Sequence, residues 1–166
     1  TQVFAATLDL EQVIGSVLEE TRRLLDVTGT SLWLLEAETQ ELVCWQSTGE
    51  GGEVVRGWRL KLGEGLAGWV ARSGQTLIVA DASADTRHTR DVDQQTGVPL
   101  RSILSVPLRA KGIVTGVLQV VDSKVNRFDE RDLRFLEPLA ASAAVAIENA
   151  RLYEVAQKLH RQARRD

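Results

Sequence analysis

Apolar residues recur with a helical period at both ends of the chain. Near the start, one stripe is spaced at intervals of three and four residues, which predicts an amphipathic helix over residues 9–27. Asp9 is the expected N-cap and Gly29 the expected stop. The stripe consists of Leu10, Ile14, Val17, Leu18, Thr21, Leu24 and Leu25.

A second helical stripe lies near the end of the chain and predicts one long helix, from an N-cap at Asp129 to about Gln162. Pro138 lies inside this helix, so we expect a bend or a local break there. Small residues dominate its middle, which allows another helix to approach closely. The stripe consists of Leu136, Ala140, Ala143, Ile147 and Ala150.

The middle of the chain has the shorter period of strands, interrupted by turns. We expect Trp33 and Trp45 to face each other across the first hairpin. Residues 81–99 are polar and irregular, and a loop of that length is usually functional. The predicted elements are strands 31–36, 41–47 and 58–62, a short helix 66–71, and strands 76–79, 102–109 and 115–122.

This order of elements predicts an α+β fold, with an antiparallel sheet rather than the alternating pattern of a parallel one. No linker or internal repeat divides the 166 residues, which predicts one domain over residues 1–166. Its core is expected at about 8–153, with 154–166 extending the last helix toward an absent effector.

Composition and charge exclude several classes of protein. Hydrophobic residues make up 43% and charged residues 26%, which is ordinary for a globular domain. No apolar run reaches the length of a membrane-spanning helix, and no secretion signal opens the chain. The segment from Arg151 onward carries +3 and the remainder −6, and an acidic body argues against nucleic acid as the main partner. We expect a cytoplasmic protein.

The single cysteine limits the chemistry further. Cys44 cannot form an internal disulfide, and with two histidines the chain cannot build the common structural zinc sites. No serine-histidine-aspartate spacing, zinc-binding helix or convincing acid pair is present. We therefore expect neither a catalytic site nor a metal site, and we expect Cys44 to pack as a small apolar residue.

Six segments follow one another in a specific order along the chain. They are Gly63–Ala71 (GEGLAGWVA), Val79–Ala82 (VADA), Val92–Gly97 (VDQQTG), Arg101–Leu108 (RSILSVPL), Gly116–Val121 (GVLQVV) and Phe128–Glu130 (FDE). Any one segment is weak evidence, but together and in this order they resemble the GAF domain, a small-molecule-sensing module of bacterial signalling proteins such as sensor histidine kinases. The resemblance covers roughly residues 8–153.

The resemblance implies a PAS-related, six-stranded antiparallel sheet. The N- and C-terminal helices would cover one face, and loops and short helices would roof a ligand pocket on the other. A small molecule would then bind beneath the 81–99 loop. For Trp69, packing in the core is the competing interpretation. The expected ligand-binding residues are Trp69, Ala80, Thr89, Asp93, Thr96, Ser102 and Leu104.

Cyclic nucleotides are one candidate ligand, because residues at the places of Asp93 and Thr96 contact them in some GAF domains. The competing interpretation of both residues is a turn inside the loop. Thr89 and Leu100 depart from the cyclic-nucleotide pattern, since an aromatic residue and a threonine are common there. Asp132 matches the aspartate of a second signature of these domains. An ion pair between Lys124 and Asp132 would hold the loop to the helix and would be structural rather than ligand-binding.

Other ligands and cofactors of the family fit this sequence less well. The 81–99 loop has no cysteine, which excludes a covalent bilin there. His88 is its only histidine, and one histidine gives little reason to expect haem or non-haem iron. The cofactor therefore stays undetermined. The family's free methionine sulfoxide reductases depend on several cysteines, which this chain does not have.

These observations predict a non-catalytic sensory domain that signals through a homodimer to an effector domain. The dimer contact is expected on Leu136, Ala140, Ala143, Ile147 and Ala150. The alternatives are a domain that dimerises and relays a signal without a ligand, and a cyclic-nucleotide-binding domain. No nucleic acid or membrane contact is expected in this segment.

Overall fold

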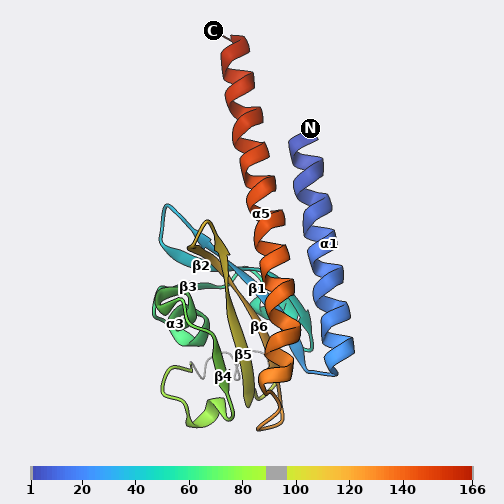
Figure 1. The fold of residues 1–166 in the computed structure, drawn as a ribbon, viewed down its shortest axis with the longest axis vertical. Coiled ribbons are helices and arrows are strands. Elements are labelled where there is room, and N and C mark those ends of the chain that lie inside the picture. The colour runs from blue at the N-terminus through green and yellow to red at the C-terminus, as the bar shows by residue number, and fades with distance from the viewer. Residues whose placement is uncertain (1, 89–96, 166) are drawn as a thin grey trace.

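The computed structural model describes residues 2–88 and 97–165 and shows a six-stranded antiparallel sheet with two long helices on one face (Figure 1). The strand order is β3-β2-β1-β6-β5-β4, so β1 and β6, which are distant in sequence, pair at the centre. The predicted fold class is confirmed. The strands are β1 (Gly29–Glu36), β2 (Glu41–Gly49), β3 (Arg59–Lys61), β4 (Leu77–Val79), β5 (Ser102–Ala110) and β6 (Ile113–Asp122).

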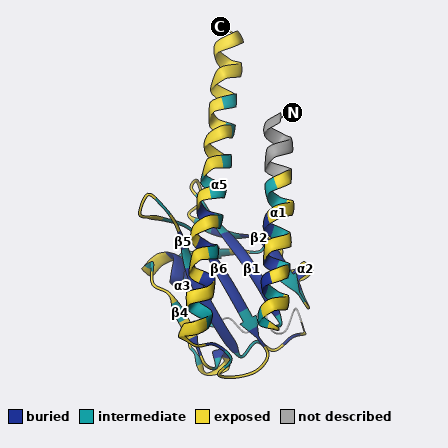
Figure 2. Cartoon of the chain, turned by 45° about the vertical axis from the view of Figure 1, so that its right-hand side comes forward, coloured by how far each residue is buried: buried dark blue, intermediate teal, exposed yellow. Residues whose placement is uncertain are grey.

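The helices on the first face are α1 (Gln2–Leu25) and α5 (Glu130–Arg165). They lie side by side, and α5 continues well beyond the edge of the sheet (Figure 1). The sheet beneath them is buried, while the far half of α5 is largely exposed (Figure 2). The helix α5 runs through Pro138 without a break, so the local break that was one of the two expectations is absent.

Both ends of α1 differ from the prediction. Asp9 lies inside the helix rather than at its N-cap, because the strong helix formers Ala5 and Ala6 continue the helix toward Gln2. At the other end Asp26, not Gly29, adopts the left-handed conformation with φ of 53°. The amide of Asp26 donates to the carbonyl of Arg23, and the amide of Val27 donates to the carbonyl of Arg22. These are the two hydrogen bonds of a Schellman cap. Gly29 instead begins β1.

The N-terminus of α5 is capped as predicted. The side chain of Asp129 accepts a hydrogen bond from the amide of Arg131, and Asp132 accepts one from the amide of Asp129. This reciprocal pair satisfies two amides that the first helical turn leaves without a partner. Asp132 also pairs with Arg127 at 4.0 Å, the place that the sequence analysis gave to Lys124.

The other face of the sheet carries the short elements. These are α2 (Gly52–Val55), which the sequence analysis did not predict, α3 (Gly65–Ser73) and the 3-10 turn η1 (Ala82–Ala84). The two tryptophans of the first hairpin lie on opposite faces, contrary to expectation. Trp33 pairs with Cys44, because an extra residue in β2 shifts the register, and Trp45 packs beneath the helices.

The hydrophobic core is divided by the sheet. The larger cluster, between the sheet and the helices, has Leu32, Leu104, Leu118, Val120 and Leu136 essentially buried. Two smaller clusters lie on the opposite face, one around Trp33 and Val70 and one around Leu66 and Ile103. The opposite face is therefore packed in patches rather than as one layer.

Candidate functional site

A cavity of about 560 Å³ lies on the face of the sheet opposite the two long helices. Its floor is formed by β1, β6 and the ends of β2 and β5. Its walls come from α2, β3, the start of α3 and the loop that leads into β5. That volume is in the range of small-molecule sites in proteins. The cavity is the strongest candidate site in the described part of the chain.

Apolar and aromatic side chains dominate the cavity, with a few polar groups among them. Trp33 and Trp58 offer indole surfaces, and planar molecules can stack on such surfaces. The apolar lining side chains also include Val55, Leu60, Leu66, Val98, Leu100, Ile103 and Val121.

The buried polar groups of the cavity are few. Ser31, Ser47 and Gln119 line it and are each at most 9% exposed. The hydroxyl of Ser31 accepts a hydrogen bond from the indole nitrogen of Trp33 at 2.9 Å. A mostly apolar site with a few fixed polar groups can orient one class of ligand.

The described residues that line the cavity include two glutamates and one arginine. Glu50 and Glu64 line it, and Arg59 is the arginine among the described lining residues. Arg59 donates to Glu36 and Glu41 at 3.0–3.1 Å, and its hydrogen bond holds the pKa of Glu36 below its ordinary value. Its charge is thus already balanced within the chain. The described lining is not a strongly basic one.

The start of α3 supplies glycine geometry to the cavity wall. Gly65 has φ of 68°, and a Cβ on Gly68 would lie 2.7 Å from the carbonyl oxygen of Lys61. These glycines are therefore required by backbone conformation and by close packing of α3 on the preceding turn. Their role in the structure is therefore a tight turn and close helix packing.

The structure places four of the expected ligand-binding residues outside the cavity lining. Ala80 is exposed, and Leu104 is fully buried beneath the helices. Trp69 is partly buried and stacks under the guanidinium of Arg87, 4.6 Å from the ring centre. Ser102 is fully buried, where its hydroxyl joins three backbone groups: it donates toward the carbonyls of Ala80 and Lys124 and accepts from the amide of Arg127.

The placement of Ser102 and Leu104 outside the cavity lining has a simple cause. Both faces of this strand are buried, so alternation in the sequence does not show which residues face the cavity. Ile103 lines the cavity, whereas Leu104 points to the helices. Thr89, Asp93 and Thr96 lie outside the described residues, so their expected roles stay predictions.

Sequence reasoning also missed the residues that form most of the cavity. Ser31, Ser47 and Gln119 each lie in a strand that was predicted, but nothing in the local sequence marks them as neighbours. Their positions become adjacent only when β2, β1 and β6 pair. For α2, the adjacent glycines Gly51 and Gly52 indicate a turn, and this was the one local signal in the sequence.

The segment that enters the 81–99 loop is fixed by its own side chains. Asp81 caps η1 by accepting from the amide and hydroxyl of Ser83, and these bonds hold the pKa of Asp81 below its ordinary value. Asp85 accepts two hydrogen bonds from Arg87, which likewise lower the pKa of Asp85. Arg87 thus links this segment to Trp69 on α3.

Cys44 does not contribute a reactive thiol. It is 1% exposed, and burial raises the pKa of its thiol to about 12. A thiol is nucleophilic as the thiolate, so Cys44 is inert at neutral pH. It packs as a small apolar residue, as the sequence analysis predicted.

Two further negative findings are limited to the described residues. No three His, Cys, Asp or Glu side chains gather there into a group that could bind a metal ion. No helix there combines the length and the apolar character needed to cross a membrane.

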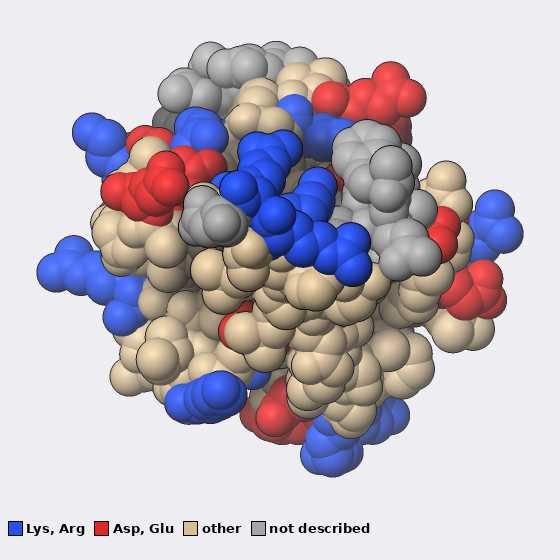
Figure 3. Space-filling model, turned by 90° about the horizontal axis from the view of Figure 1, so that it is seen from above, with Lys and Arg blue, Asp and Glu red and all other residues tan. Residues whose placement is uncertain are grey.

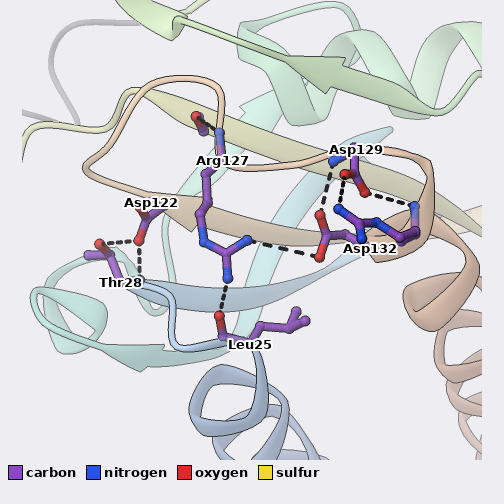
Figure 4. Close-up of polar contacts among 8 residues, drawn as sticks. Leu25, Thr28, Asp122, Arg127, Asp129 and Asp132 are labelled. Carbon is purple, nitrogen blue, oxygen red and sulfur yellow. Dashed lines mark hydrogen bonds and ion pairs between the residues drawn. The ribbon is translucent and has the colours of Figure 1, made fainter.

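A cluster of polar contacts connects the loop before α5 to both long helices (Figure 4). Arg127 donates to the carbonyl of Leu25 at the end of α1 and pairs with Asp132 at the start of α5. Asp122 accepts from the amide and hydroxyl of Thr28. Because Ser102 holds the Arg127 amide, these contacts join the β4 exit to the bases of both helices.

The predicted dimer stripe packs within the chain. Leu136, Ala140 and Ile147 are at most 6% exposed in the core beneath the sheet, and Ala143 packs against them. Ala150 is partly buried on the same side of α5. Leu136, Ala140 and Ile147 are therefore used within the chain, whereas Ala143 and Ala150 keep partly exposed surface.

Comparisons with known proteins agree with this architecture. A solved GAF domain from an Acinetobacter phosphoenolpyruvate-protein phosphotransferase is 26% identical, with a TM-score of 0.76, over 87% of this chain and 85% of that one. A free methionine-R-sulfoxide reductase from Neisseria meningitidis, solved with its substrate, shares the fold at 23% identity and a TM-score of 0.75, covering 87% and 81%.

Among curated proteins, a probable 3′,5′-cyclic phosphodiesterase, pde-5 of Caenorhabditis elegans, is 29% identical over 161 residues. The match covers 92% of this chain and 22% of that protein, so the chain spans about a fifth of this relative. This relative is described as a probable phosphodiesterase, whereas the sequence analysis named sensor histidine kinases as the example. A family model described as GAF domain matches residues 7–148, and the chain therefore belongs to the GAF domain family, a family of regulatory modules.

Proposed function

We propose that this chain is a non-catalytic regulatory domain that binds a small organic molecule in the cavity and transmits its occupancy through α1 and α5. The single observation that carries the proposal is the cavity of about 560 Å³, with apolar walls, two tryptophans and buried polar groups. A domain of this size gains stability by closing such a space, so a retained cavity favours a ligand. The inert Cys44 favours binding over catalysis.

The polar cluster of Figure 4 supports the relay part of the proposal. Ser102 and Arg127 connect the exit of β4, which leads toward the 81–99 loop, with the bases of α1 and α5. A ligand that binds two arrangements of this loop with different affinity would shift the helices through these contacts. A cytoplasmic histidine kinase and a cyclic phosphodiesterase are both effectors that a longer protein could couple to α5.

Cyclic nucleotides remain an alternative ligand, and the likeness to a probable cyclic phosphodiesterase favours testing them. Trp33 and Trp58 provide the signal, because a ligand in the cavity would change their fluorescence. Titration with cAMP and with cGMP therefore tests this alternative directly. A change of fluorescence with either nucleotide, absent in a Val121→Phe variant whose cavity is filled, would support it.

The main experiment is native mass spectrometry of the purified chain, followed by identification of any released molecule. We expect a mass excess that is retained under native conditions and lost on denaturation. The Val121→Phe variant is the matched control and should carry none. Wild type without any excess, together with no tryptophan response to small-molecule probes, would contradict ligand binding and favour the ligand-free relay.

A specific observation also favours dimerisation, through a stripe different from the one predicted. On α5, Val145, Leu152, Val155 and Leu159 are 51–61% exposed and lie opposite the buried side of the helix. Val145, Leu152 and Leu159 are seven residues apart, the spacing of a coiled-coil seam. On α1, Val13, Val17 and Leu24 are also exposed. We therefore place the homodimer contact on these residues.

A charge in the exposed α5 seam tests this contact. Leu152→Glu should convert the dimer to a monomer in sedimentation or light scattering, without loss of helix content. Arg161→Glu, on the opposite side of the same helix, is the control and should leave the dimer intact. A Leu152→Glu chain that stays dimeric would exclude this seam.

A further inference from the structure

Four polar side chains form one row across the cavity face of the sheet. The register aligns Ser47 of β2 with Ser31 of β1, Ser31 with Gln119 of β6, and Gln119 with Ser105 of β5. Their exposed fractions are 9%, 9%, 8% and 0%. The first three line the cavity. A continuous polar row is unusual on a sheet face that is otherwise apolar.

Part of this row has no hydrogen-bond partner within the described chain. The carboxamide of Gln119 and the hydroxyl of Ser47 bond to none of the described residues, and the hydroxyl of Ser105 is buried and unsatisfied. Buried polar side chains are nearly always hydrogen-bonded, so each exception requires an explanation. Ser105 is such an exception, because its hydroxyl is itself buried. Gln119 is 92% buried as a residue and lines the open space of the cavity, so its carboxamide is available to a ligand there.

The chemistry of the carboxamide narrows the class of partner. It holds an acceptor oxygen and a donor nitrogen side by side in one plane. A lactam or a primary carboxamide presents the same two groups in the opposite order, and both bonds then form together. Ser31, whose oxygen already accepts from Trp33, keeps its own hydrogen to donate beside them. The tryptophans favour a planar ligand.

The charges around the cavity agree with a neutral ligand. Among the described lining residues, Glu50 and Glu64 are acidic, Arg59 is bonded to Glu36 and Glu41, and His88 contributes an imidazole. A phosphate would lie near the carboxylates of Glu50 and Glu64, whereas a neutral heterocycle would not be repelled. The class that satisfies both observations is a flat, uncharged molecule with an amide edge.

We propose that Gln119 determines the specificity of the cavity by pairing with the lactam or carboxamide edge of a neutral, planar ligand. This inference rests on the proposed function, because it names the ligand class of the same cavity. Ser31 and Ser47 flank the pair from β1 and β2. Gln119 acts as a binding residue and not as part of the hydrophobic core.

A competing role is that Gln119 turns toward Ser105 and bonds it within the chain. The two residues are direct cross-strand partners, whose Cβ atoms are normally about 4.5–5.5 Å apart. In that case Gln119 would stabilise the empty domain. If Gln119 instead binds the ligand, replacing it by an apolar residue of the same length removes an unsatisfied group and leaves the empty domain at least as stable.

The test compares hypoxanthine with purine, two heterocycles that differ by the lactam group. Binding is followed by tryptophan fluorescence and by calorimetry on wild type, Gln119→Met and Ser105→Ala. We expect wild type and Ser105→Ala to bind hypoxanthine at least tenfold more tightly than purine. We expect Gln119→Met to lose this difference while its thermal midpoint stays at or above that of wild type.

Several results would overturn the inference. Equal binding of the two probes by wild type, no binding of either, or an unchanged preference in Gln119→Met would each do so. A lower thermal midpoint in both Gln119→Met and Ser105→Ala, with the preference unchanged, would assign Gln119 to the internal bond. A retained molecule without an amide edge, found by native mass spectrometry, would remove this inference but leave the proposed function intact.

Discussion

The two faces of the sheet have the same strands but different packing. Side chains alternate between the two faces along β5 and β6. This alternation places Leu104, Leu118 and Val120 beneath α1 and α5 in a continuous layer, where each is at most 2% exposed. On the other face, two smaller clusters flank a cavity and a polar row. The first face supplies most of the stability, and the second keeps a space that a ligand can fill.

The difference also shows in the elements that cover each face. Two long helices cover the first face, and the strands beneath them are buried (Figure 2). Short helices and loops cover the second face, and among them α3 is largely buried whereas α2 buries only Gly52. A short element with few buried residues can move at low cost in free energy, which suits the entry of the ligand that we propose.

Cys44 lies in the buried cluster around Trp33 and Val70, so its reactivity reports whether this cluster opens to solvent. At pH 8, a pKa of about 12 in place of 9.0 lowers the thiolate fraction about a thousandfold. Alkylation by iodoacetamide should therefore be slower than in the urea-unfolded chain by at least this factor, as measured by mass spectrometry. Rapid labelling of the folded protein would show that this cluster opens.

Leu104→Ala tests the helix-covered face. Leu104 is fully buried beneath α1 and α5, and truncation of such a leucine usually costs about 2–5 kcal/mol. Urea unfolding should show this loss. Ligand retention in native mass spectrometry should persist at temperatures where the variant is folded, because Leu104 does not line the cavity. A selective loss of ligand without loss of stability would return Leu104 to the site.

Val120 and Val121 give a matched comparison of the two faces, since they are adjacent residues of the same type. Val120→Ala should cost about 2 kcal/mol, because it leaves a void in a filled layer. Val121→Ala should cost less than about 1 kcal/mol, because Val121 borders a space that already exists. Equal losses in urea unfolding would mean that the two faces are packed alike.

Asp26→Gly tests the turn that ends α1 and should have the smallest effect. Asp26 adopts φ of 53°, which glycine adopts without strain. We expect a gain of up to about 1 kcal/mol in the free energy of unfolding, with no change in ligand retention. Lys111→Gly, at φ of 53° in the hairpin between β5 and β6, is a control at a second site of the same conformation. A loss of stability at Asp26 would show that its side chain matters more than its backbone strain.

The basic end of α5 belongs to neither face. Seen down onto the C-terminal end of the molecule, Lys and Arg side chains gather at the centre of the view, where Arg164 and Arg165 form the last turn (Figure 3). Cations at this end offset the negative pole of the helix macrodipole.

The sequence by itself determined the elements and their order. Helical and strand periods are local properties, so α3, α5 and all six strands were predicted to within a few residues, and α1 was predicted apart from its first turns. The capping box of Asp129 and Asp132 was also predicted, because it depends on a spacing of three residues. The resemblance to the GAF family then gave the topology and the faces.

Only the tertiary structure decided which residues meet. Leu104 and Ser102 were expected at the cavity, but both faces of β5 are buried and the pattern does not distinguish them. The apolar stripe around Ala140 was predicted to contact a second copy of the chain, but it packs on the sheet. An apolar stripe on a helix can pack on a sheet or on another helix, and the sequence does not distinguish the two. Ser47, Ser31, Gln119 and Ser105 form a row only through pairing between strands, and pairing partners are not encoded in the spacing of a single strand.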